Sequence, residues 1–333
     1  MKRLIFTLAI AVSFIACKDG KKAAAASDRP DTIAISKCPE FVADSAMKSI
    51  EDQCAFGPRV TGTKAHVLCG DYIVNRFKEY GCEVTEQTMQ LKAYDGTVLP
   101  GRNIIASTNP DKADRILICA HWDCRPWADH DPDEANHRKP ILAANDAASG
   151  VAVMLELARQ VQQSPIEYGI DFICFDAEDW GMPEWEDEEK YAGVEDSWCL
   201  GSTYWAKNPH KENYAARYGI LLDMVGGRGS TFAMEGVSRY YADTVVQMLW
   251  HLAAQIGYGA YFPIKDGGTV QDDHVPVNQI AGIPCVDIIP HFEQGPSSFG
   301  PTWHTVSDTP ENIDPAVLKA VGQSLLQLMY NDK

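Results

Sequence analysis

The chain carries Ile-Leu-Ile-Cys-Ala-His-Trp-Asp at residues 116–123, an apolar run that ends in polar side chains. A similar run at 170–175 leads into Asp-Ala-Glu-Asp at 176–179. Both runs are short and lack regular polar alternation, which is typical of strands that helices cover on both faces of a sheet. Three further runs are expected to be strands for the same reason: 103–106, 220–222 and 286–289.

Helical patterns lie between these runs. Residues 65–80 place apolar side chains at helical spacing, and Gly81 follows them as a common helix stop. Similar stripes cover 147–163, 241–256 and 315–330. This alternation predicts an α/β fold, a three-layer sandwich with a mostly parallel central β-sheet and helices on both faces.

The first residues are expected to be a targeting signal. Lys2 and Arg3 precede an apolar run from Leu4 to Ala16 that is too short to span a membrane as a mature helix. The pair Ala16-Cys17 resembles the lipobox of bacterial lipoproteins, in which the cysteine is lipidated. Cleavage by an ordinary signal peptidase, with an incidental cysteine, is the alternative.

We therefore expect three parts in the chain. These are a lipoprotein signal peptide over 1–16, a flexible lipidated tether over 17–37, and one α/β domain over 38–333. This organisation predicts a protein of the bacterial cell envelope that is held by its lipid anchor and faces the periplasm.

Composition and motifs exclude several classes of protein. The net charge of −17 argues against a nucleic-acid partner, because phosphate binding needs Lys and Arg. Nine cysteines follow Cys17 without any Cys-x-x-Cys pair, so neither disulfides nor a cysteine zinc site is assigned. The sequence lacks Gly-x-Ser-x-Gly and His-Glu-x-x-His, and the small residues at 147–150 are interpreted as allowing close helix packing. No oligomeric state is indicated.

Acidic residues stand where expected strands end and helices begin. Asp223 follows the run at 220–222, and Asp146 precedes the helix expected from 147. Ligands of open α/β sheets bind beyond the carboxyl ends of the strands, and carboxylates combined with imidazole suit zinc. Taken singly, Asp146 could cap a helix, Asp223 could end a strand and His304 could be a surface histidine. Their joint pattern predicts a metal site.

The following segments carry a family resemblance: Phe56-Gly57-Pro58-Arg59-Val60, His121-x-Asp123, Asn145-Asp146, Glu178-Asp179, Asp223 and Trp303-His304-Thr305. Together they resemble the zinc aminopeptidase clan. Three features resemble one branch of this clan, the glutaminyl cyclases of animal type and their bacterial relatives. One is the tryptophan directly before His304. The other two are the segments Asp272-Asp273-His274-Val275-Pro276 and His121-Trp122-Asp123-Cys124-Arg125-Pro126-Trp127-Ala128-Asp129. The resemblance covers about residues 50–330.

The resemblance implies one bound Zn²⁺, held by Asp146, Asp179 and His304, with Glu178 as the general acid/base. The sequence departs from the animal pattern at Asp179, where animal cyclases and many aminopeptidases have Glu. This side chain is shorter by one methylene, so the local backbone must compensate for its shorter reach.

The resemblance also implies roles around Glu178. Asp223 and Asp272 would form a carboxylate hydrogen-bond network beside it. Trp303 would line the substrate pocket, and Phe299 is a further candidate for that wall.

The implied reaction converts the N-terminal Gln of a peptide or protein into pyroglutamate and releases ammonia. Zinc would polarise the γ-carbonyl group, and Glu178 would move the proton. A two-zinc aminopeptidase remains the alternative. In that case His121, Asp146 and Asp223 would hold the second zinc with Asp146 bridging; otherwise His121 is structural. A binding lipoprotein with a degenerate site would be expected to lose Glu178 or a ligand, and these residues are retained.

Overall fold

The computed structural model describes residues 33–194 and 197–332. The signal peptide expected over 1–16, the lipidated Cys17 and most of the expected tether lie outside the described residues. The division of the chain into three parts therefore stays a prediction.

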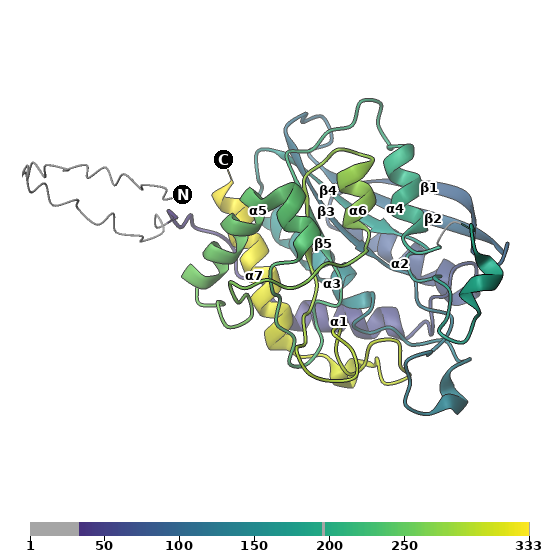
Figure 1. Ribbon diagram of the computed structural model, residues 1–333. Helices are drawn as coiled ribbons and strands as arrows, with labels where there is room; N and C mark the ends of the chain where they lie inside the picture. Colours follow the sequence, from purple (N-terminus) through teal and green to yellow (C-terminus); the bar gives the residue numbers. More distant parts are fainter. Residues whose placement is uncertain (1–32, 195–196, 333) are drawn as a thin grey trace, which may run out of the picture. The chain divides into compact units, whose positions relative to one another are not determined.

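A six-stranded sheet forms the middle layer of the domain, in the order β1-β2-β4-β3-β5-β6 (Figure 1). The strands are β1 (Glu83–Lys92), β2 (Val98–Thr108), β3 (Arg115–His121), β4 (Gly169–Phe175), β5 (Gly219–Leu222) and β6 (Cys285–Ile288). Strands β4, β3, β5 and β6 are parallel, and β2 and β1 extend the sheet in antiparallel pairing. The five expected strands are present, and β1 is an additional one.

Helices cover both faces of this sheet (Figure 1). They are α1 (Ala43–Cys54), α2 (Lys64–Glu79), α3 (Ala148–Gln163), α4 (Leu200–Lys207), α5 (Gly236–Gln255), α6 (His274–Gln279) and α7 (Pro315–Asn331), with short 3₁₀ turns at Glu134–Asn136, Glu188–Tyr191 and Pro310–Asn312. Helices α4 and α6 pack on one face, and the other helices form the opposite layer. The predicted three-layer α/β fold is confirmed.

Helix α5 begins earlier than the sequence pattern indicates. We expected it to start at residue 241, but it starts at Gly236 because the Glu235 side chain caps its first amides. The backbone at Ala242 leaves helical geometry, with φ −136°. This break lies between the first turns of α5 and the part of the helix that carries the apolar stripe. The stripe therefore did not predict the first turns.

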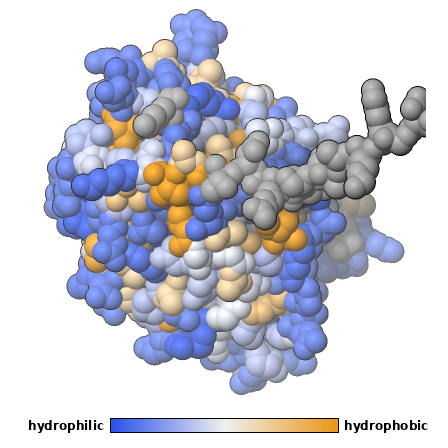
Figure 2. Space-filling view, turned by 90° about the vertical axis from the view of Figure 1, so that its left-hand side faces the viewer, coloured by the Kyte–Doolittle hydropathy of each residue, from blue (hydrophilic) through white to orange (hydrophobic). Residues whose placement is uncertain are grey.

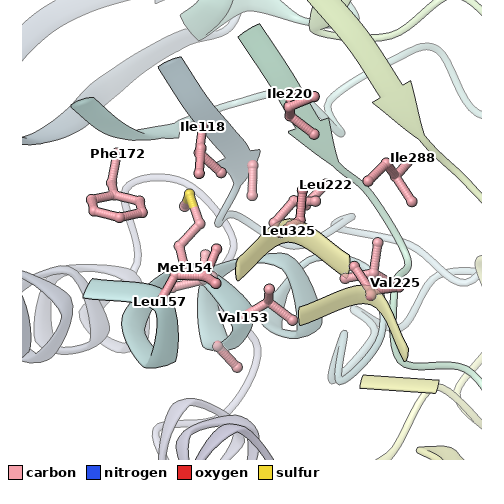
Figure 3. Packing of buried hydrophobic residues seen from close by; sticks show 14 of the residues in the cluster. Ile118, Val153, Met154, Leu157, Phe172, Ile220, Leu222, Val225, Ile288 and Leu325 are labelled. Carbon is pink, nitrogen blue, oxygen red and sulfur yellow. The ribbon is translucent and has the colours of Figure 1, made fainter. Parts of the chain in front are cut away.

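Side-chain alternation along the strands decides which layer each residue joins. Ile118 of β3 and Ile220 of β5 belong to the core against α3, and Figure 3 shows them on the side of Met154. Their neighbours Cys119 and Leu221 join the core under α4 and α6. Because both faces are buried, these strands need no polar alternation.

Helix α3 approaches the sheet closely because Gly150 has no side chain. A Cβ atom at this position would lie 2.4 Å from the carbonyl oxygen of Leu222 and 2.8 Å from the Cβ of Ala120. Real Cβ atoms do not approach backbone this closely, so a larger residue would push the helix away. The close contact brings the start of α3 to the carboxyl ends of β3 and β5.

The described chain enters the domain at the amino ends of the strands. Ser36 donates its amide N–H to the side chain of Asn331, at the end of α7, over 2.8 Å. The same end of α7 is bound to the start of β4, because the Tyr168 hydroxyl donates to the carbonyl of Met329 over 2.7 Å. Residues 33–36 therefore lie at the edge of the sheet opposite to the strands' carboxyl ends.

The described helices, one face of the surface and the cysteines bear on membrane contact and on disulfides. Within 33–194 and 197–332, no helix combines the length and apolar character needed to cross a bilayer. Viewed toward α5 and α7, the surface is mostly hydrophilic with small separate hydrophobic groups (Figure 2). The nine cysteines of the described chain are free, and those inside β3 and β4 are buried, as expected for small apolar residues.

Candidate active site

The predicted polar residues meet at the carboxyl ends of β3, β4 and β5. His121 ends β3, Asp179 follows β4, and Asp223 follows β5 directly. Asp146 comes from the segment before α3, and His304 from the loop before α7. Two sets of three residues place their ligand atoms within 4.8 Å of one another: Asp146, Asp179 and His304, and His121, Asp146 and Asp223.

The three residues predicted to bind zinc converge on His304. Its Nε2 atom lies 3.2 Å from Oδ1 of Asp179 and 3.7 Å from Oδ2 of Asp146. Burial lowers the pKa of His304 well below its usual value, so the imidazole is neutral. The second carboxylate oxygen of Asp179 is buried without a hydrogen-bond partner among the described residues. A neutral imidazole and a buried carboxylate oxygen without a partner fit a zinc ion, and the ligand role of these residues stays a prediction.

The local structure excludes the two simpler interpretations, in which Asp146 caps a helix and His304 is a surface histidine. The residue that caps α3 is Ala147, without a side-chain cap, so Asp146 does not cap the helix. His304 is only 2% exposed and is not a surface histidine. Asp308 accepts the backbone N–H groups of Asn145 at 2.7 Å and Asp146 at 3.0 Å, which fixes the backbone that carries Asp146.

The turn after β4 is shaped by two further acids. Asp123 accepts the amide N–H groups of Glu178 at 3.1 Å and Asp179 at 3.3 Å. Asp176 accepts the amide of Ala177 at 2.8 Å, and Ala177 adopts the left-handed region with φ 52°. The turn therefore presents Glu178 and Asp179 together, and the shorter side chain of Asp179 still reaches His304.

Arg125 and Asp129 support the same corner of the site. Arg125 donates to the carbonyl of Asp179 over 3.2 Å and to the carboxylate of Asp129 over 2.7 Å. Oδ1 of Asp129 lies 3.5 Å from Nδ1 of His304, and the guanidinium covers the ring of Trp198 at 4.6 Å. Nδ1 of His304 has no hydrogen-bond partner among the described residues, so Asp129 faces the ring at this distance without a hydrogen bond. A carboxylate near the far nitrogen of a ligand histidine helps to orient the ring.

His121 joins the second cluster through Asp146. Its Nε2 atom lies 2.9 Å from Oδ1 of Asp146 and 3.3 Å from Oδ1 of Asp223, and Nδ1 lies 3.4 Å from Asp123. Burial opposes protonation, but these carboxylates raise the pKa of His121 well above its usual value. Because its two oxygens approach different histidines, Asp146 can act as a terminal ligand of one metal or as a bridge between two.

The predicted acid/base, Glu178, lies between the metal cluster and Asp272. Exclusion of water raises the pKa of Glu178 well above its usual value; His121 opposes this shift, and Asp179 and Asp272 add to it. The Cys199 thiol donates to Oε1 of Glu178 over 3.3 Å. Glu178, Cys199 and Asp272 form one close cluster, whereas the contact described for Asp223 is with His121. The expected carboxylate network therefore stays a prediction.

A cavity of about 350 Å³ opens in front of these acids. Both residues predicted for its wall, Phe299 and Trp303, line it, and their ring centroids are 4.8 Å apart. The Trp303 ring stacks on His304, with centroids 3.9 Å apart. Aromatic rings and acids thus line the same cavity, with Trp303 directly against the candidate ligand His304.

Sequence reasoning missed part of the cavity wall, namely Trp198, Met224, Thr269, Val270, Gln271 and Ile289. Met224 and Gln271 stand beside Asp223 and Asp272, so their position next to predicted site residues was a usable signal. Trp198 reaches the site through a β-bridge with Asp179, a long-range contact that leaves no local pattern in the sequence.

The chain is similar to a known protein family and to solved structures of bacterial enzymes. Residues 103–329 match the family model of Peptidase family M28. The crystal structure of Tannerella forsythia glutaminyl cyclase is 51% identical, with a TM-score of 0.86, and the match covers 89% of this chain and 100% of that chain. Bacteroides thetaiotaomicron glutaminyl cyclase, solved with N-acetylhistamine, is 48% identical, with a TM-score of 0.85 and coverage of 89% and 100%.

A curated relative points to a second activity in the same family. Aminopeptidase YwaD of Bacillus subtilis (strain 168) is 28% identical over 290 residues, which are 82% of this chain and 53% of that protein. The chain thus spans about half the length of this relative, in contrast to its match with the whole of the two solved cyclases.

We expect Asp129→Asn to weaken zinc binding by about 10- to 100-fold, because an amide supports the ligand imidazole less well than a carboxylate does. Competition with a chromophoric chelator measures this affinity. The control is Asp133→Asn, which changes an exposed carboxylate that caps a 3₁₀ turn. Equal affinity in Asp129→Asn and the wild type would exclude the supporting role of Asp129.

Proposed function

The chain belongs to peptidase family M28, and from this premise we propose that it is a zinc-dependent glutaminyl-peptide cyclotransferase. It converts the N-terminal glutamine of a peptide or protein into pyroglutamate and releases ammonia. The observation that carries the proposal is the similarity over the full length of two solved bacterial glutaminyl cyclases. The cavity, which is lined by both acids and aromatic rings, suits this substrate.

The cavity walls bind the glutamine residue in a folded conformation. The cavity has a volume of about 350 Å³, which admits one glutamine side chain with its α-amine but not a long peptide segment. Trp198, Phe299 and Trp303 enclose the aliphatic part of the side chain, so the γ-carboxamide lies near the α-amine. Holding the two reacting groups together removes much of the entropic barrier to ring closure.

Asp146, Asp179 and His304 hold one zinc ion, which supplies a Lewis acid for the γ-carbonyl oxygen. Glu178 moves the proton. The α-amine nitrogen forms a bond with the γ-carbon while Glu178 accepts its proton, and the proton then passes to the departing nitrogen as the bond to ammonia breaks. A carboxyl with a raised pKa suits both steps, and the Cys199 thiol holds Glu178 in place.

A two-zinc aminopeptidase is the second candidate, because the contacts of His121 favour it. His121, Asp146 and Asp223 form a complete cluster that could hold a second zinc ion. Glu178 would then activate a water molecule for hydrolysis of the first peptide bond. The two activities share every acid of the site and differ in the product.

The deciding experiment incubates the purified protein with a peptide that begins with glutamine. Mass spectrometry should show the loss of one ammonia from a peptide of unchanged length. Release of free glutamine and a shortened peptide would instead establish the aminopeptidase.

In the same assay we expect Glu178→Gln to lower turnover by at least about 10²-fold, because an amide cannot carry the proton. Zinc content should equal that of the wild type, since Glu178 is not one of the three ligands. Glu167→Gln, an exposed change far from the cavity, is the control. Undiminished turnover in Glu178→Gln would remove this residue from the mechanism.

We further propose that the protein is a lipoprotein of the bacterial cell envelope, anchored through Cys17 and facing the periplasm. The basic start, the short apolar run and the Ala16-Cys17 pair support this proposal. The position of residues 33–36 agrees with it, because the chain enters the domain at the edge opposite to the cavity.

Fractionation of cells that express the full chain tests the anchor. The wild type should be found with the membranes, and Cys17→Ala should lose lipid and either become soluble or keep its uncleaved signal. Cys38→Ala, which changes the next cysteine along the chain, is the control. Wild-type protein with an unmodified N-terminus in the soluble fraction would contradict the proposal.

A further inference from the structure

Glu235 is a buried carboxylate whose contacts extend beyond the helix that it caps. At the start of α5 it accepts the amide N–H groups of Val237 at 2.8 Å and Ser238 at 2.6 Å. The same carboxylate accepts the amide of Val270 at 3.0 Å and lies 3.2 Å from Nε2 of His274. A helix cap requires only the first two bonds. The other two contacts join α5 to the segment that forms one wall of the cavity.

That segment, residues 269–274, carries Asp272. Residues 269–272 line the cavity, and His274 begins α6. Oδ1 of Asp272 accepts the amide of its neighbour Asp273 at 2.5 Å. Oδ2 is buried without a hydrogen-bond partner in the described part of the chain, and the carboxyl lies close to Glu178. The position of the Asp272 carboxyl therefore depends on how its own backbone segment is held.

His274 links this segment to the sheet. Its ring is fully buried, with Nε2 toward Glu235 and Nδ1 3.7 Å from Oδ2 of Asp287 on β6. Burial favours the neutral form of Glu235, but His274 and the helix amides lower its pKa to about 2. Glu235 therefore faces the imidazole as a carboxylate, and the His274 ring is held between Glu235 and Asp287 by close packing, because neither ring nitrogen has a hydrogen-bond partner among the described residues.

Asp287 completes the group of buried polar side chains. It is 0% exposed, and neither carboxylate oxygen has a hydrogen-bond partner among residues 33–194 and 197–332. Asp272, His274 and Asp287 place one atom each within 4.8 Å of one another. The Asp287 amide donates to the Ser238 hydroxyl at 2.9 Å, and that hydroxyl donates to Glu235 at 2.7 Å. The contacts thus connect β6, α5, α6 and the cavity wall.

We propose that Glu235, His274 and Asp287 form a buried positioning network that holds Asp272 and the cavity wall in the geometry that the reaction uses. Burying ionisable groups is costly, and they are found most often where a site needs them. The three residues do not line the catalytic cavity, so they act through Asp272 and residues 269–271. The proposal rests on the proposed function because Asp272 lies beside Glu178, the residue that moves the proton in that reaction.

The first test compares kcat and KM of His274→Gln and Asp287→Asn with the wild type on a glutamine-initiated peptide. A misplaced Asp272 should lower kcat by about 10- to 100-fold, with zinc content unchanged. Asp287→Asn keeps nearly the same shape and carries the test if His274→Gln does not fold. The matched control is Asp314→Asn, which replaces the carboxylate that caps α7 with an amide and does not touch the cavity. Wild-type kcat in both network variants would overturn the proposal.

The second test asks whether the network acts through Asp272. In an Asp272→Asn background, the same changes should lower kcat by less than about 2-fold, because coupled residues are not additive. An equal loss in both backgrounds would show an independent, structural effect and overturn the proposal. The wild type is assayed first. If the wild type hydrolyses the peptide and does not cyclise its glutamine, the proposed function fails. The same variants are then compared, in both backgrounds, by their rates of hydrolysis.

Discussion

The crowding of carboxyl groups at one edge of the sheet is the constraint on which the rest of the site depends. His121 and Phe175 are register partners at the ends of β3 and β4, so the polar residues that follow neighbouring strands emerge side by side. Burial disfavours ionisation of these carboxyl groups, and like charges at such distances add to the effect. The raised pKa values of Glu178, Asp179 and Asp272 reflect this. A bound cation offsets the crowding, and the acid left without a metal bond can carry a proton.

The acids at this edge divide into two groups according to what their oxygens accept. Asp123 and Asp308 each accept two backbone N–H groups, and each holds a turn that carries a candidate ligand. Glu235 does the same for α5 and the cavity wall. Asp179 and Asp272 instead keep an oxygen without a described partner, which leaves it available to a metal ion or a substrate. The supporting acids thus fix the backbone from which the reacting acids extend.

Much of the fold was predictable because strands buried on both faces produce uninterrupted apolar runs. Strand β1 was not, since it lies at the edge and most of its residues are exposed or half-buried. Glu178 and Asp179 were identifiable because they follow an expected strand at the edge where ligands of open α/β sheets bind, and the family resemblance implied their roles. Trp198 could not be found, because a bridge to Asp179 closes a long loop. Asp287 was hidden inside an expected apolar strand, and only the fold shows that it faces His274.

The central claim is a division of labour in which Asp146, Asp179 and His304 hold the metal and Glu178 moves the proton. Anomalous diffraction at the zinc edge, from crystals equilibrated with excess zinc, tests it most directly. The account predicts one zinc peak, bound by these three side chains, with His121 in direct contact with Asp146. A second peak of equal height between His121, Asp146 and Asp223 would contradict it and establish a two-metal enzyme.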